Sequence, residues 1–126
     1  MALFRKQDSK TILRAIVPYP VVLVPNHFGG FDAEFPNFPN GRATGVNFDM
    51  AVKAAEEELT HQLYKILKDH GTPPSPSDPD LLYPDDDEPA GTQVIMIEPD
   101  QDALLRRLGL LKKPRRTAPT GEKYET

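Results

Sequence analysis

The stretch of sequence that decides the fold runs from residue 19 to residue 79 and reads YPVVLVPNHFGGFDAEFPNFPNGRATGVNFDMAVKAAEEELTHQLYKILKDHGTPPSPSDP. Two extended segments rich in apolar residues meet at the turn Gly29-Gly30, where glycine permits backbone conformations closed to other residues. A loop rich in proline and asparagine, a long amphipathic segment and a proline-rich exit follow. This order predicts two strands, a loop, a third strand and a helix, with no catalytic motif among them.

The first extended segment, residues 12–24, is rich in β-branched residues. Pro18 and Pro20 interrupt it, and proline cannot donate a hydrogen bond to a neighbouring strand. The strand is therefore bulged, lies at an edge of the sheet, or begins only near Tyr19. It contains no acidic residue and so offers no carboxylate to a metal ion of the kind that nucleases use.

The second segment, residues 31–35, alternates between apolar and acidic residues. Asp32 and Glu34 would share one face of the strand, and the apolar residues would share the other. Residues 42–46 predict a short third strand. We expect the two carboxylates to be exposed.

The segment after Asn47 carries a helical pattern. Asn47 is a good N-cap, and Asp49 lies where the helix dipole favours an anion. Gly71 and Pro73 mark the end. Apolar residues recur every three or four positions, at Phe48, Val52, Ala55, Leu59, Leu63 and Ile66. The pattern predicts an amphipathic helix of about six turns.

The chain then changes character. Residues 72–92 hold six prolines and no basic residue, which predicts an extended or mobile acidic loop. The unbroken apolar run Val94–Ile97 predicts a central strand, covered on both faces. Asp100 can cap a short helix at residues 101–108, and a polar tail begins at Lys112.

These elements predict an α+β fold, in which a small antiparallel sheet carries one long helix on one face and a short C-terminal helix follows. We divide the chain into a flexible leader (1–11), one domain (12–98, with the loop 72–92) and a short helix with a basic tail (99–126). The chain has 126 residues, one domain by length, and no cysteine. No signal peptide or membrane span is evident, so we expect a cytoplasmic protein.

Several short sequence cues between residues 15 and 98 stand in a defined order. They are YPVVL at 19–23, GGF at 29–31, FPNFPNG at 35–41, TG at 44–45, the helix positions Ala51, Ala54, Ala55 and Leu59, the exit GTPPSPS at 71–77, and VIMI at 94–97. Together they resemble the HicB-type antitoxin family, small bacterial proteins with a partial RNase H-like β-β-β-α-β core. The long acidic loop and the absence of the usual cysteine near Gly41 depart from the family pattern.

The resemblance implies a HicA-like partner, a small RNA-cleaving toxin with a dsRBD-like fold and a catalytic histidine, which the antitoxin neutralises by occluding its active site. The chain would then be a non-enzymatic binding protein without cofactor or metal. Many family members carry a C-terminal helix-turn-helix or ribbon-helix-helix module. The residues after Ile97 are too few for either, so we do not predict DNA binding.

Charge gives candidate binding residues. An acidic surface would cover the basic, RNA-binding surface of such a toxin. The acids that we predict to face the partner are Asp32, Glu34, Asp85, Asp86, Asp87 and Glu88. The alternative for the acidic loop is a solvated linker. Leu104, Leu105 and Leu108 would pack on a neighbouring subunit or on the sheet.

The sequence is also compatible with two other functions. The first is that of a solitary HicB-fold homo-oligomer with a regulatory or ligand-binding role. Alternatively, the basic tail around Arg106–Arg116 binds nucleic acid through phosphate contacts, although it has no aromatic residues for stacking.

Overall fold

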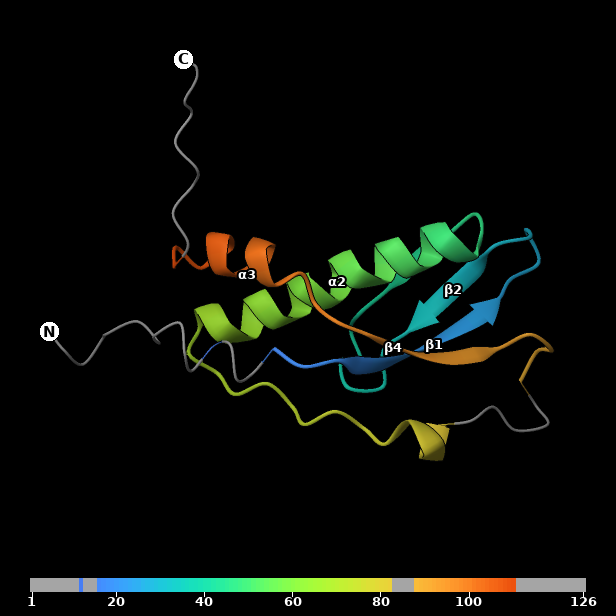
Figure 1. Ribbon diagram of the computed structural model, residues 1–126. Coiled ribbons are helices and arrows are strands. Elements are labelled where there is room, and N and C mark those ends of the chain that lie inside the picture. The colour runs from blue at the N-terminus through green and yellow to red at the C-terminus, as the bar shows by residue number, and fades with distance from the viewer. Residues whose placement is uncertain (1–11, 13–15, 83–87, 111–126) are drawn as a thin grey trace, which may run out of the picture.

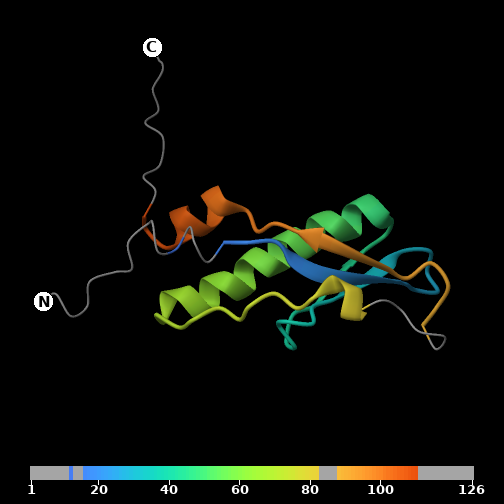
Figure 2. The same ribbon diagram turned by 60° about the horizontal axis from the view of Figure 1, so that its bottom comes forward.

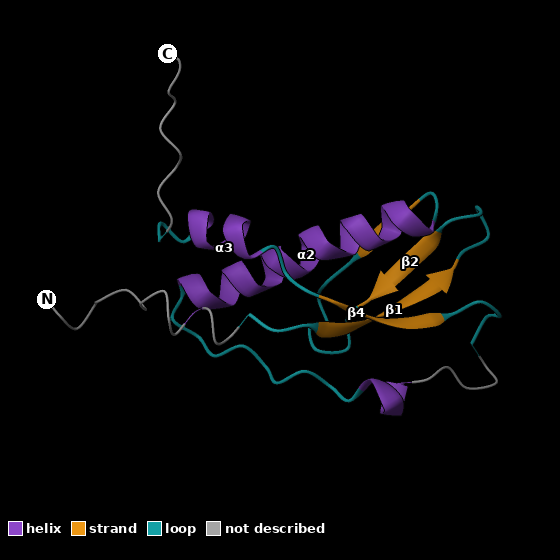
Figure 3. Cartoon of the chain, in the orientation of Figure 1, coloured by secondary structure: helices purple, strands orange, loops and turns teal. Residues whose placement is uncertain are grey.

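The computed structural model describes residues 12, 16–82 and 88–110 (Figure 1). Its elements are the strands β1 (Tyr19–Pro25), β2 (Phe31–Glu34) and β3 (Ala43–Gly45), helix α2 (Phe48–Lys68), the 3-10 helix η2 (Pro79–Leu82), strand β4 (Gln93–Ile97) and helix α3 (Gln101–Arg107). The strands form one antiparallel sheet in the spatial order β3-β2-β1-β4. Figure 3 shows β2, β1 and β4 of this sheet. The predicted α+β fold is confirmed.

Strand β1 begins at Tyr19 and pairs with β2 on one side and β4 on the other. The hairpin closes with a hydrogen bond from the Asn26 N–H to the Gly30 carbonyl, at 2.9 Å. Because backbone groups alternate in direction along a strand, the even-numbered residues of β1 point theirs towards β2 and the odd-numbered residues towards β4. An N–H group at Pro20 would point towards β2. Because β2 pairs with β1 only from Val22 onwards, the proline costs the sheet no hydrogen bond.

Helix α2 covers one face of the sheet. Asn47 caps it as predicted, accepting a hydrogen bond from the Met50 N–H at 2.8 Å. The fully buried apolar positions follow a four-residue spacing, at Ala51, Ala55, Leu59, Leu63 and Leu67. The predicted Phe48, Val52 and Ile66 are only partly buried and pack around the margin of this core. Phe48 meets Phe31 edge-on at a ring separation of 5.5 Å.

Strand β4 lies at the edge of the sheet, so the prediction of a central strand is wrong. Ile97 is buried in the core and Ile95 packs against it. Met96 points to the opposite face and is 48% exposed. An unbroken apolar run indicates that a strand carries apolar side chains on both faces. It does not determine whether the strand lies at the centre or at an edge of the sheet.

The proline-rich strap, which we define as residues 72–82, runs along the sheet on the side away from α2 (Figures 1 and 2). Tyr19 is buried, and its hydroxyl donates a hydrogen bond to the Pro74 carbonyl at 2.7 Å. Burial raises the pKa of the Tyr19 hydroxyl above its ordinary value of 10.0, so the hydroxyl remains a donor at neutral pH. Residues 72–78 of the strap form neither helix nor strand and lead into η2, while residues 83–87 of the predicted loop lie outside the described residues.

Asn37 fixes the strap more directly. Its side-chain amide donates to the Ser75 carbonyl at 2.9 Å and accepts from the Ser77 N–H at 3.1 Å. The Asn37→Ala variant should therefore lose about 1 kcal/mol of unfolding free energy and exchange the Ser77 amide hydrogen faster. Asn40→Ala, in the same exposed loop, is the control and should change neither. Unchanged exchange at Ser77 in Asn37→Ala would show that this contact does not hold the strap.

Candidate partner-binding surface

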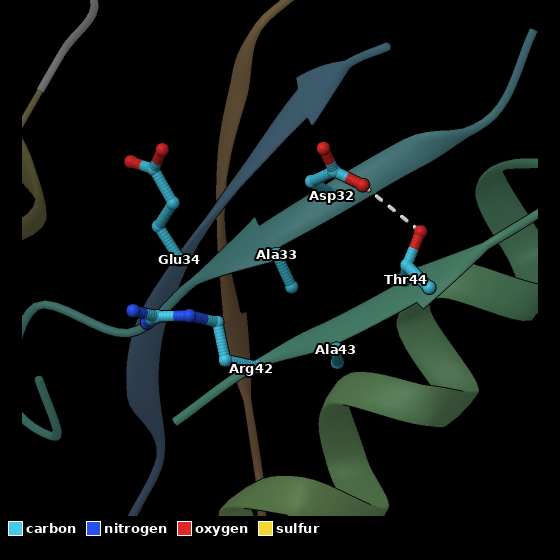
Figure 4. Close-up of a pocket in the computed structure, with 6 residues that line it drawn as sticks. All are labelled: Asp32, Ala33, Glu34, Arg42, Ala43 and Thr44. Carbon is cyan, nitrogen blue, oxygen red and sulfur yellow. Dashed lines mark hydrogen bonds between the residues drawn. The ribbon is translucent and has the colours of Figure 1, made fainter. Parts of the chain in front are cut away.

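The carboxylates predicted from the sequence lie on the face of the sheet that points away from α2. The register pairs Asp32 with Val24 and Thr44, and Glu34 with Val22. Ala33 is buried on the helix side, so its two neighbours point the other way. They line an open cavity of about 590 Å³ between β2 and β3, which we call the β2–β3 groove and which is lined by Asp32, Ala33, Glu34, Arg42, Ala43 and Thr44 (Figure 4).

Neighbouring side chains hold the Asp32 carboxylate in place. The Asn26 side-chain amide donates to its Oδ1 at 3.1 Å. The Thr44 hydroxyl donates to the same oxygen at 2.9 Å (Figure 4). Neither contact uses Oδ2. Asp32 therefore presents a pre-oriented acceptor to a cationic group, which reduces the entropy lost on binding.

Glu34 and Arg42 complete the polar surface of the groove. Glu34 is exposed, two residues along β2 from Asp32, which places the two Cα atoms about 7 Å apart. The Arg42 guanidinium donates to the carbonyls of Gly41 (3.0 Å) and Pro39 (3.2 Å). Because Arg42 contacts its own loop in this way, the groove offers two carboxylates side by side.

The remaining predicted site residues lie elsewhere. Asp85, Asp86 and Asp87 lie outside the described residues, and Glu88 is exposed. Leu104 and Leu105 are buried in the chain's own core, and Leu108 packs against it. The first two therefore offer no surface to another subunit.

Sequence analysis missed three residues of this surface: Asn26, Arg42 and Thr44. Asn26 is part of the hairpin turn, and the other two become neighbours of Asp32 and Glu34 only through the pairing of β2 with β3. The predicted strand at residues 42–46 could have revealed Arg42 and Thr44. An antiparallel partner of β2 places alternate residues beside Asp32 and Glu34 on the same face of the sheet, and in this strand those residues are polar.

Within the described ranges, no group of three or more histidine, aspartate or glutamate residues is placed to hold a metal ion. Within the same ranges, no helix is long and apolar enough to cross a membrane.

At the other end of the molecule, Arg107 of α3 lies over the Tyr64 ring at 4.2 Å and 3.3 Å from His61 Nδ1. These contacts join α3 to α2.

The solved structures that resemble this fold include two antitoxin-related proteins. One is the antitoxin HicB from Burkholderia pseudomallei, with a TM-score of 0.61 and 14% sequence identity over 83% of this chain and 75% of that one. The other is a chain of a toxin–antitoxin complex from Streptococcus pneumoniae, with a TM-score of 0.61 and 19% identity over 83% of this chain and 81% of that one. No protein-family model matches the sequence, and neither does any curated protein. The chain has a HicB-like fold.

Proposed function

We propose that this chain is an antitoxin-like binding protein that neutralises a HicA-like, RNA-cleaving toxin by covering its active site. The observation that carries the proposal is the pair of carboxylates, Asp32 and Glu34, on the exposed face of a HicB-like sheet. A protein that cleaves RNA must attract phosphates with basic side chains, and a fixed pair of carboxylates competes for those side chains.

In this proposal the chain performs no chemistry. Asp32, held by Asn26 and Thr44, and the adjacent Glu34 accept hydrogen bonds from lysine or arginine residues of the toxin. The sheet then excludes RNA sterically. Charge complementarity contributes chiefly to the rate of association, so binding should weaken as salt rises. On charge alone, we also propose that Asp85, Asp86, Asp87 and Glu88 face the toxin.

The direct test measures RNA cleavage by a HicA-like toxin from the same genome, with and without this protein. We expect stoichiometric amounts to stop cleavage, and co-expression to restore growth of toxin-producing cells. Undiminished cleavage in the presence of excess protein would reject the proposal. Binding of RNA by this chain itself, lost steeply with added salt, would favour the nucleic-acid alternative.

Substitutions that change the charge of the β2–β3 groove test whether it binds the toxin. Glu34→Lys should lower the affinity for the toxin roughly tenfold or more, because it replaces an attraction by a repulsion. Asp32→Asn should have a smaller effect, since the amide oxygen can still accept from Asn26 and Thr44. Surface plasmon resonance at two salt concentrations is the measurement.

The matched control is Glu57→Lys, which makes the same change of charge at an exposed position on α2. It should leave toxin affinity within a factor of about two, because surface charges outside the contact are screened at physiological salt. Equal effects of Glu34→Lys and Glu57→Lys would show that net charge, and not the β2–β3 groove, governs binding.

A further inference from the structure

Phe28, at the tip of the turn between β1 and β2, is the most exposed large apolar side chain of the described residues, at 85%. Its ring lies against the neighbouring His27 ring, at a centroid distance of 4.4 Å. A single exposed apolar residue is ordinary on a protein surface. Phe28 differs because several hydrogen bonds fix the backbone that carries it.

The Asn26 side chain organises the turn. Its Oδ1 accepts hydrogen bonds from the N–H groups of Phe28 and Gly30, each at 3.0 Å. Its backbone closes the turn, since the N–H donates to the Gly30 carbonyl at 2.9 Å and the carbonyl accepts from the Gly29 N–H at 3.2 Å. A partner that covers the Phe28 ring therefore has little backbone freedom to freeze, which lowers the entropic cost of binding.

The turn is also fixed against β3. A methyl group at Gly30 would clash with the Gly45 carbonyl oxygen and would lie 3.0 Å from the Val46 Cα. The turn thus packs closely on the end of β3, at the end of the sheet where α2 begins (Figure 1). Val46 is itself 78% exposed, so two exposed apolar side chains belong to this end of the molecule.

The same asparagine connects the turn to the β2–β3 groove. While Asn26 Oδ1 holds the turn, the amide nitrogen of the same side chain donates to Asp32 Oδ1 at 3.1 Å. One side chain therefore sets both the backbone direction at Phe28 and the orientation of a carboxylate in the groove. A partner that binds Asp32 meets the aromatic ring in a fixed position relative to that carboxylate.

We propose, on the basis of the function proposed above, that Phe28 is an apolar anchor for the same basic partner whose lysine or arginine residues bind in the β2–β3 groove. Asn26 is a positioning residue that presents the ring and the Asp32 carboxylate together. The partner then carries an apolar pocket beside its basic residues. A few aromatic side chains seated in such pockets commonly supply most of the affinity of a protein interface.

Charge favours a basic protein as the occupant. Asp32 is hydrogen-bonded to the turn through Asn26, and Glu34 follows on the same face of β2. An exposed aromatic residue on a loop also suits single-stranded nucleic acid or a membrane surface. Phosphates and anionic lipids are repelled by these carboxylates, whereas a basic protein is attracted by them and buries the ring as well.

The first test is the Phe28→Ala variant, which should keep its fold because the ring is exposed. Surface plasmon resonance with the HicA-like toxin of the inhibition experiment should show a dissociation constant raised roughly tenfold or more, mainly through faster dissociation. The factor should be the same at two salt concentrations, because burial of apolar surface is not screened. The effect of Glu34→Lys depends on salt, so the two contributions are distinguishable.

The matched control is Leu81→Ala, which truncates a side chain of similar exposure, 82%, in η2. Helix η2 contacts β4, at the edge of the sheet opposite β3, so the toxin affinity should stay within a factor of about two. Equal losses in the two variants would contradict a specific role for the turn. Unchanged affinity of Phe28→Ala for a toxin that the wild type inhibits would overturn the anchor and leave the antitoxin-like function standing. A wild type that does not inhibit the toxin would reject both.

A double-mutant cycle tests the positioning role of Asn26. Asn26→Ala should raise the dissociation constant roughly tenfold in the wild-type background. In a protein that already carries Phe28→Ala and Asp32→Ala, the same change should have an effect of less than about twofold, because no ring or carboxylate remains to be positioned. Equal factors in the two backgrounds would show that Asn26 does not act through these residues.

Nuclear magnetic resonance of the Phe28 ring distinguishes the toxin from other occupants. The ring signals should shift when the toxin is added and should not depend on the concentration of this chain alone. Shifts that follow the concentration of the chain would assign the ring to a contact between copies. Shifts caused by vesicles of phosphatidylglycerol and phosphatidylcholine would assign it to a membrane surface. Either of these two results would overturn the proposal.

Discussion

The Gly45→Ala variant should lose about 3 kcal/mol or more of unfolding free energy, although it adds one methyl group. Gly45 lies in β3 directly under the first turn of α2. A Cβ atom at this position would lie 2.6 Å from both the Ala51 Cα and the Met50 carbonyl carbon, and would also clash with the Ala51 N. These atoms belong to the helix backbone and cannot rotate away, so the helix and the sheet must separate.

Gly29→Ala provides the matched control, because it tests backbone strain without a clash. Gly29 has a φ of 89°, but no atom lies within 4 Å of a Cβ built there. It should cost about 1–2 kcal/mol, the usual penalty for a left-handed residue with a side chain. Urea denaturation at one fixed protein concentration compares the two. If Gly45→Ala proved no more costly than Gly29→Ala, then α2 does not approach β3 as closely as described.

Local patterns predicted the elements of this fold well. Asn47 ahead of an apolar periodicity indicated where α2 begins, and Asp100 indicated α3 in the same way, since each side chain caps its helix. The period-two pattern of residues 31–35 predicted the exposed carboxylates. Each of these properties depends on residues within a few positions of one another, which is why the sequence alone was sufficient.

Properties that depend on distant residues could not be predicted. The place of β4 at an edge follows from its pairing with β1, whose residues lie 70 to 78 positions earlier in the chain. The docking of the strap depends on Asn37, which hydrogen-bonds residues 38 and 40 positions away. The orientation of Asp32 by Thr44 depends on the register of two strands. No periodicity encodes such pairings.

The Leu104→Ala variant should lose about 3 kcal/mol of unfolding free energy, a large share of the roughly 5–15 kcal/mol that stabilises a small domain. The Leu104 side chain has no exposed surface and belongs to the same core as Leu59 and Leu63 of α2. The start of α3 is tied to α2 as well, because the Asp100 N–H donates to the buried Thr60 hydroxyl at 2.9 Å.

Alanine variants at three positions of α3 distinguish the contribution of side-chain packing to stability from that of helix formation. Leu108→Ala, at a half-buried position, should cost less than Leu104→Ala, and Arg106→Ala, at an exposed one, should cost a few tenths of a kcal/mol. Chemical denaturation of the three variants at equal protein concentration gives the ranking. Equal and small losses would show that α3 is dispensable for the core. The expected ranking would mean that a chain ending at Ile97, where the β-β-β-α-β pattern is complete, lacks part of the core that holds α2 in place.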